Sequence, residues 1–167
     1  MVTLGLDAST TCVGYAFTKD KKILDMGFID IKKEKTPKEK VQKVLEFINS
    51  FSYIDQVFDI NIEDNLSGFA GGRTSQQVII KLAKFNAILC FMLEEMFDFN
   101  VHSINPMTAR KKVFGKARVK GIKAKDFVKR QIEEMYDTKK WCKKTTRGNW
   151  DKRNIDAYDG LVMSLYD

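Results

Sequence analysis

The sequence contains little of what several common classes of site require. It has one histidine, His102, and three cysteines, Cys12, Cys90 and Cys142, in 167 residues. A histidine-based zinc site, a Ser-His-Asp triad and a Cys-His pair would all depend on that single histidine, so the composition argues against each of them. The three cysteines cannot all pair, and no export signal is present, which indicates reduced thiols in an intracellular compartment.

Long apolar runs and chain-breaking residues are also scarce. No stretch approaches the roughly 18 to 20 uncharged apolar residues that a membrane span requires. The apolar strip that begins at Val2 is broken by Asp7, unlike a signal peptide. With 2 Pro, 10 Gly, 44% hydrophobic and 31% charged residues, the chain is expected to be neither disordered nor of low complexity. We expect one domain over residues 1–167.

Charge is present in quantity, and it is unevenly placed. The formal net charge is +7, yet residues 105–153 hold 17 Lys/Arg against 5 Asp/Glu, and the rest of the chain holds 12 against 17. A basic third beside an acidic remainder is typical of a polyanion-binding surface next to a site that needs carboxylates. From charge alone, a solvated lysine-rich face is an equally good interpretation.

Hydrophobic periodicity predicts one α/β domain with a mixed sheet and the element order βββαβαβα. Strands are predicted over residues 2–6, 12–17, 23–31, 57–63 and 101–104. Helices are predicted from Thr36-Pro37, over 75–97, from Pro106, over 124–136 and over 155–166. The first three strands are expected to form an antiparallel meander. The 75–97 helix is apolar nearly all round, so we expect it to be covered on two sides, by its own sheet and by something else.

Four carboxylates occupy positions that indicate a shared site. Asp7 ends the first strand and Glu63 ends the fourth, so parallel pairing of these strands would place both at one edge of the sheet. Asp156 and Asp159 are three residues apart and share a helix face. Asp64, the neighbour of Glu63, should point to the opposite face of the sheet. Taken singly, each acid could be a turn former or a helix cap.

Acids that converge in this way repel one another unless cations bind or their pKa values rise. Ligands that are all oxygen favour Mg²⁺ or Mn²⁺. Two such ions, roughly 3.5–4 Å apart, can clamp the attacking and leaving oxygens of a phosphodiester. Together with the basic third, the four acids favour a metal-dependent nuclease.

Four segments stand in the order of a known family. They are Leu4-Gly5-Leu6-Asp7, Asn61-Ile62-Glu63, a Pro-x-x-x-Lys-x-x-x-x-Gly frame over 106–115 with Arg110 at the lysine position, and Asp156-Ala157-Tyr158-Asp159. In motif order and spacing, nearly the whole chain resembles the RuvC family of Holliday-junction resolvases, within the RNase H-like nucleases, in a phage or viral type. The set of motifs carries this resemblance, since each motif alone is weak.

The resemblance implies an RNase H-like fold: a five-stranded mixed sheet, three antiparallel strands and then two parallel ones, flanked by helices. It implies a Mg²⁺-dependent endodeoxyribonuclease with two ions per active site, for which Mn²⁺ could substitute. Paired nicks would resolve four-way junctions and other branched DNA, leaving 5′-phosphate and 3′-hydroxyl ends. It also implies a homodimer in the intracellular compartment, the host cytoplasm for a phage protein, with no membrane and no nucleotide cofactor.

The resemblance also suggests residue roles. The four acids would bind the metal and act in catalysis, with Lys120 or Lys123 as catalytic lysines of the basic connector. The helix over 75–97 would meet its dimer mate through Ile80, Ile88 and Phe91. Two residues, Leu66 and Phe69, are candidates for a wedge that prises open the centre of the junction. Five cations are expected to contact the DNA: Arg73, Arg110, Lys111, Lys116 and Arg118.

Three other interpretations compete with this one. Asp7-Ala8-Ser9-Thr10-Thr11 also looks like the phosphate loop of sugar kinases and actin-like ATPases, but those proteins need two such domains to enclose a nucleotide. A non-catalytic nucleic-acid-binding module would use the basic third alone and leave the placed acids unexplained. An RNase H-like nuclease on another substrate, such as an RNase H or a flap nuclease, is the nearest rival.

Overall fold

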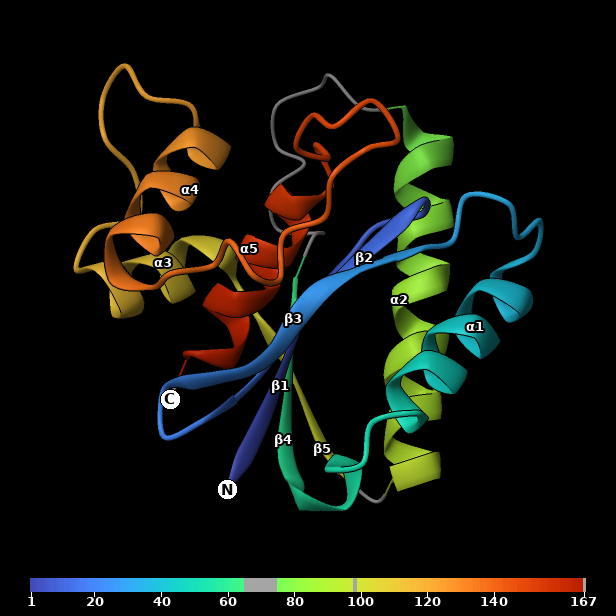
Figure 1. The fold of residues 1–167 in the computed structure, drawn as a ribbon. Helices are drawn as coiled ribbons and strands as arrows, with labels where there is room; N and C mark the ends of the chain where they lie inside the picture. Colours follow the sequence, from blue (N-terminus) through green and yellow to red (C-terminus); the bar gives the residue numbers. More distant parts are fainter. Residues whose placement is uncertain (65–74, 98, 167) are drawn as a thin grey trace.

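The computed structural model describes residues 1–64, 75–97 and 99–166, and its elements follow the predicted order (Figure 1). The strands are β1 (Val2–Ala8), β2 (Cys12–Lys19), β3 (Lys22–Asp30), β4 (Val57–Glu63) and β5 (Asn100–Ile104). The helices are α1 (Pro37–Asn49), the short 3-10 helix η1 (Ile54–Gln56), α2 (Gln76–Phe97), α3 (Pro106–Phe114), α4 (Ala124–Met135) and α5 (Asn154–Ser164). Both bounds of β4 agree with the prediction, whereas β2 extends two residues further than predicted.

Within the described residues, the strands form one five-stranded mixed sheet in the order β3-β2-β1-β4-β5. β1, β2 and β3 pair antiparallel, and β4 and β5 continue the sheet in parallel with β1. The two-residue turn between β2 and β3 places Asp20 and Lys21 at positive φ (51° and 60°), as a tight hairpin requires. The parallel strands need crossovers, which α1 and α2 provide. The predicted sheet, three antiparallel strands followed by two parallel ones, is confirmed.

Helices α1 and α2 cover one face of the sheet, and α5 lies on the other with α3 and α4 beside it (Figure 1). Alternate residues of β1 and β4 form the core beneath α1 and α2: Leu4, Leu6, Ile60 and Ile62. The start of α1 is fixed by a capping box, in which Thr36 and Glu39 each accept the other's backbone N–H through their side chains. The predicted helix start at Thr36-Pro37 is therefore confirmed.

Glycines allow α5 to lie unusually close to the sheet. A Cβ added to Gly5 in β1 would overlap the backbone of Gly160 and Ser164, and one added to Gly14 in β2 would overlap the backbone of Asp156. Because any side chain at these positions would push the helix away, the glycines set the distance between α5 and the ends of β1 and β2.

Polar side chains of the sheet also hold the far end of α5. The buried amide of Asn61 in β4 donates to the carbonyls of Met163 (3.1 Å) and Tyr166 (2.9 Å). The buried Thr18 hydroxyl in β2 donates to the carbonyl of Ser164 at 3.0 Å. These bonds satisfy carbonyl groups that a helix end leaves without partners, and they fix the helix in register with the strands.

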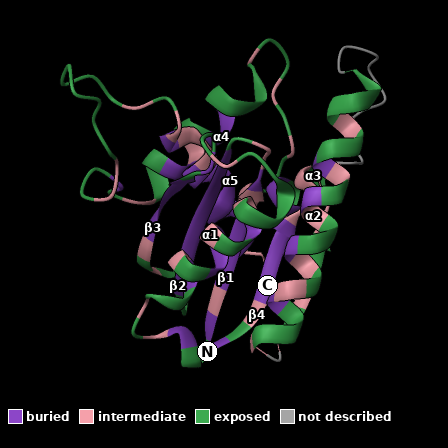
Figure 2. Cartoon of the chain, turned by 90° about the vertical axis from the view of Figure 1, so that its right-hand side faces the viewer, coloured by how far each residue is buried: buried purple, intermediate pink, exposed green. Residues whose placement is uncertain are grey.

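Helix α2 has two apolar sides, as predicted. One side is buried against the sheet and α1: Leu82, Phe85, Leu89 and Leu93. The other side is exposed in the single chain (Figure 2) and includes Ile80, Ile88 and Phe91. By length and composition alone, α2 could also cross a membrane, a test that core helices of soluble proteins pass as well. Its buried side shows that it packs on the sheet of this domain.

Candidate functional site

Two carboxylates stand side by side at one edge of the sheet. β1 and β4 are parallel, and Leu6 pairs with Ile62, so the residues that follow them, Asp7 and Glu63, are neighbours. Gly5 in β1 and Asn61 in β4 both contact α5. Asp7 and Glu63 come two positions later in these strands, so strand alternation places them on the same face of the sheet. Asp64 therefore points to the opposite face. The register agrees with the predicted shared edge.

Helix α5 brings two more carboxylates to this edge. Asp156 lies in its first turn, and Asp159 follows one turn later. Asp159 is buried and Asp156 is half-buried. The close approach of Gly14 to the backbone of Asp156 holds this first turn against the sheet. The four predicted acids thus come from β1, β4 and α5 to one end of the sheet.

The electrostatics show that these acids act on one another. Burial, followed by the charges of Glu63, Asp159 and Asp156, holds the pKa of Asp7 well above its ordinary value. Burial and then Asp159 raise the pKa of Glu63 to about 7. Burial also raises the pKa of Asp159, although Arg110 opposes this shift. Keeping all four acids ionised is therefore unfavourable, and a nearby cation would relieve the repulsion.

Two cations of the chain already contact the cluster. The buried guanidinium of Arg110 in α3 donates from Nη2 to Oδ1 of Asp159 at 3.1 Å. Lys125, at the start of α4, places Nζ 2.8 Å from Oδ1 of Asp156. The Lys125 side chain is 59% exposed, so its ammonium can meet a ligand from solvent while it remains close to Asp156.

Lys125 is a residue that sequence reasoning did not single out. It lies within a run of basic residues, where composition does not distinguish it from Lys120 and Lys123. A usable signal was the amphipathic pattern of α4, because residues 125, 128 and 132 share one helix face and Val128 and Ile132 are buried. That pattern places Lys125 on the packed face of α4, although its side chain is exposed, as are those of Lys120 and Lys123.

The donor set can be tested for its fit to a metal ion. Within residues 1–64, 75–97 and 99–166, no three His, Cys, Asp or Glu side chains converge closely enough to hold one as they stand. However, Oε2 of Glu63 is buried and has no hydrogen-bond partner. An oxygen-only set with mutual repulsion and an unsatisfied buried oxygen suits a hard cation such as Mg²⁺ or Mn²⁺. The residues therefore fit such an ion, and Asp7, Glu63, Asp156 and Asp159 are the side chains that would hold it.

The remaining predicted site residues lie elsewhere. Exposed cations follow α3 or lie on its surface: Lys111, Lys116, Arg118, Lys120 and Lys123. Arg110 differs from these, since it is buried and engaged with Asp159 and not on the exposed basic surface expected for a DNA contact. On α2, Ile80, Ile88 and Phe91 are exposed. Three predicted DNA contacts lie outside the described residues: Leu66, Phe69 and Arg73.

Comparisons with known proteins give a structural match only. No family model and no curated protein matches the sequence. Thermus thermophilus RuvC in complex with a Holliday junction substrate aligns with a TM-score of 0.62 and 14% identity, over 99% of this chain and 90% of that chain. A second Thermus thermophilus RuvC structure aligns with a TM-score of 0.60 and 14% identity, over 99% and 92%. The chain therefore has an RNase H-like fold that matches RuvC, as predicted, and nothing in these matches supports a phage or viral type.

Proposed function

We propose that the protein is a metal-dependent endonuclease that resolves four-way DNA junctions and cuts other branched DNA. The observation that carries the proposal is the meeting of Asp7, Glu63, Asp156 and Asp159 at one end of a sheet whose fold matches RuvC. One of the matched RuvC structures is a complex with a Holliday junction substrate. The basic surface beside the acids supports a substrate that brings several phosphates to the site.

In this mechanism, the four acids would hold two Mg²⁺ ions, or Mn²⁺ in their place. When bound, such ions supply an activated water and stabilise the charge that develops on the attacking and leaving oxygens of the phosphodiester. Arg110 neutralises the buried Asp159 and keeps its carboxylate oriented. Lys125, close to Asp156 and partly exposed, is positioned to contact the phosphate at the cut.

The exposed cations on α3 and between α3 and α4 are proposed to hold the arms of the junction. Each phosphate that a Lys or Arg neutralises contributes about one unit to the slope of log affinity against log salt. Among Lys111, Lys116, Arg118, Lys120 and Lys123, a residue acting at the cut would lose cutting and keep affinity when replaced by Ala. Residues that only position the arms would weaken binding for junctions of any sequence.

Two alternative nuclease functions can be distinguished from this one by their cleavage products. An RNase H would cut the RNA strand of a hybrid, and a flap nuclease would cut one strand near a single branch. The test is to map the cuts on an immobile four-way junction, a flapped duplex and an RNA–DNA hybrid of matched sequence. The proposal requires symmetric nicks in two opposing strands of the junction that DNA ligase can reseal. Cutting confined to the hybrid or the flap would favour the corresponding rival.

We further propose that the active form is a homodimer, with the exposed side of α2 against the same side of its mate. Phe91→Glu is expected to give monomers, because burying an unpaired carboxylate in an apolar interface costs several kcal/mol. Phe91 is 59% exposed in the single chain, so the change should not disturb folding. Sedimentation of both proteins at micromolar concentration measures the effect.

The matched control is Phe58→Glu, since Phe58 is 53% exposed in β4 and lies on a different element. This control is expected to sediment like the wild-type protein. A wild-type protein that sediments as a monomer would contradict the dimer and would weaken the paired-nick mechanism.

A further inference from the structure

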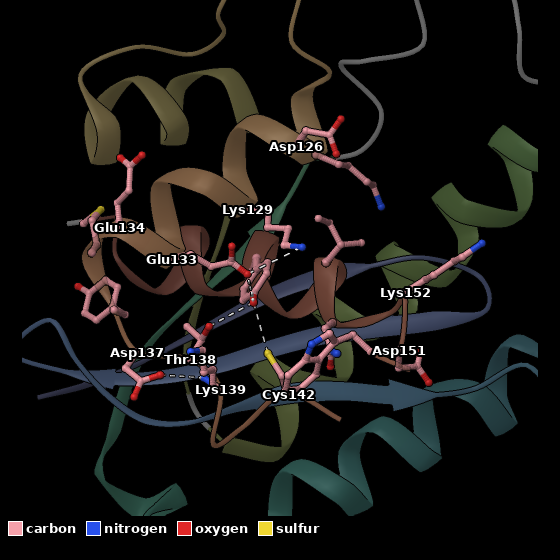
Figure 3. Close-up of a pocket in the computed structure, with 17 residues that line it drawn as sticks. Asp126, Lys129, Glu133, Glu134, Asp137, Thr138, Lys139, Cys142, Asp151 and Lys152 are labelled. Atoms are coloured by element: carbon pink, nitrogen blue, oxygen red, sulfur yellow. Dashed lines mark hydrogen bonds and ion pairs between the residues drawn. The ribbon is translucent and has the colours of Figure 1, made fainter. Parts of the chain in front are cut away.

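A pocket of about 840 Å³ lies beside the carboxylates, between α4, the segment from Asp137 to Cys142, and the segment from Trp150 to Ile155 (Figure 3). Its size is within the range of about 300–1,000 Å³ that is usual for sites of small organic ligands. Lys125 lines the pocket and lies 2.8 Å from Asp156. One end of the pocket is therefore next to the candidate metal-binding acids.

The pocket has a buried polar floor. Tyr158 of α5 lines it and is almost fully buried, and its hydroxyl donates to Oε1 of Glu133 at 3.2 Å. The hydroxyl of Thr138, also buried, lies 3.2 Å from the hydroxyl oxygen of Tyr158. Glu133 and Thr138 are both drawn among the lining residues in Figure 3. The carboxylate of Glu133, held by Tyr158 and itself exposed, offers an acceptor to a ligand that donates hydrogen bonds.

Charges of both signs line the pocket. Its lysines are Lys125, Lys129, Lys139 and Lys152, and its acids are Asp126, Glu133, Glu134, Asp137 and Asp151. Lys139 lies beside Asp137, and Lys152 lies near Asp151 (Figure 3). A polyanion could not fill the whole pocket, because its charges would meet these carboxylates. A ligand with one anionic group, for a lysine such as Lys125, and an uncharged part that donates hydrogen bonds fits this mixed lining.

Trp150 provides an aromatic wall. Its side chain lines the pocket and is 53% exposed, and Nζ of Lys144 lies 5.0 Å from the centroid of its ring. Trp150 pairs with Lys144 in a short antiparallel bridge, and the Asn154 side chain bonds both the N–H and the carbonyl of Lys143. Because Asn154 is the first residue of α5, this hairpin holds Trp150 in place relative to Asp156.

From these features we infer that the pocket binds one unpaired nucleotide of the DNA strand at the cut. The base stacks on Trp150 above the polar floor, and its phosphate lies toward Lys125. An exposed aromatic ring beside cations is the usual arrangement for holding single-stranded nucleic acid. The inference rests on the proposed function, since it assigns to the nuclease a preference for strands with unpaired nucleotides.

The test compares two labelled DNAs: a duplex interrupted by a short thymidine gap and the fully paired duplex of the same length. Affinities are measured by fluorescence anisotropy with Ca²⁺ in place of Mg²⁺, so that binding is separated from cutting. Trp150→Ala is expected to weaken binding of the gapped DNA by roughly 5- to 150-fold, the usual effect of removing one stacking aromatic. Binding of the paired duplex should stay unchanged, and Trp150→Phe should restore most of the affinity for the gapped DNA.

Phe58→Ala is the matched control, because Phe58 is as exposed as Trp150 and does not line the pocket. The inference is overturned if Trp150→Ala changes both affinities equally or changes neither. Cutting of branched DNA by the wild-type protein in Mg²⁺ is scored separately. A wild-type protein that binds the gapped DNA through Trp150 but cuts no branched DNA would refute the proposed function and leave the nucleotide pocket standing.

Discussion

Asp7→Asn is expected to reduce junction cutting by about a thousandfold or more while junction binding stays close to wild type. Asp7 is the acid whose pKa is raised by all three of the others, so it lies where all four charges act together. The amide keeps the volume of the side chain and removes one ligand charge. Bound metal supplies several kcal/mol of transition-state stabilisation, and each factor of ten in rate corresponds to about 1.4 kcal/mol. Single-turnover cutting and equilibrium binding of the same labelled junction measure the two effects.

The same substitution should raise the free energy of unfolding in metal-free buffer. Asp7 is half-buried among like charges, and replacing it with a neutral amide removes both the desolvation of a charge and the repulsion. Asp64→Asn is the control, since it removes the same charge from the far side of β4 and should have a mild effect on cutting. An inactive Asp64→Asn enzyme with a normal Asp7→Asn enzyme would show that the site lies on the other face of the sheet.

Arg110→Ala is expected to lower the free energy of unfolding by about 3–5 kcal/mol, because it leaves the carboxylate of Asp159 buried without its partner. Only 10% of the Arg110 side chain and 4% of the Asp159 side chain are exposed, so water cannot replace the lost bond. Denaturant unfolding in the absence of DNA measures this effect. Because native proteins are stable by only about 5–15 kcal/mol in total, the loss should be evident as a large shift in the midpoint.

Lys111→Ala is the matched control, since Lys111 is the next residue of α3, carries the same charge and is exposed. Its unfolding midpoint should match the wild-type value. If Arg110→Ala left stability unchanged and weakened only DNA affinity, Arg110 would act as the surface contact expected from the sequence and not as the buried partner of Asp159.

The fold could be predicted from the sequence because its local sequence patterns agree with one another. The apolar runs over β1 and β4 end in Asp7 and Glu63, and Thr36-Pro37 marks the start of α1. An acid directly after a buried strand is costly without a partner, which is why the pattern indicated a site. The parallel pairing of β1 with β4 then placed the two acids together, as expected from the order of elements.

The cations of the site were harder to predict from the sequence. Arg110, in a helix with Lys111 and Lys112, looks like one member of a solvated basic surface, and only the packing of α3 against α5 shows that it is buried. Lys125 also lies among other basic residues and looks like part of the same solvated surface. The close contact of α5 with the sheet also depends on Gly5 and Gly14, and which glycine meets a neighbouring backbone cannot be read from one sequence. Long-range packing decided the burial of Arg110 and the roles of the two glycines, whereas for Lys125 the amphipathic pattern of α4 carried a signal.

The most direct test of the central claim is cutting of a labelled immobile four-way junction and a matched linear duplex, each with Mg²⁺ and in metal-free buffer. We expect that the wild-type protein nicks the junction in Mg²⁺ and neither cuts the linear duplex nor acts without a divalent ion, because the four carboxylates need a bound cation to act together. Junction cutting of equal rate in metal-free buffer, or binding without cutting under every condition, would contradict a metal-dependent nuclease at Asp7, Glu63, Asp156 and Asp159.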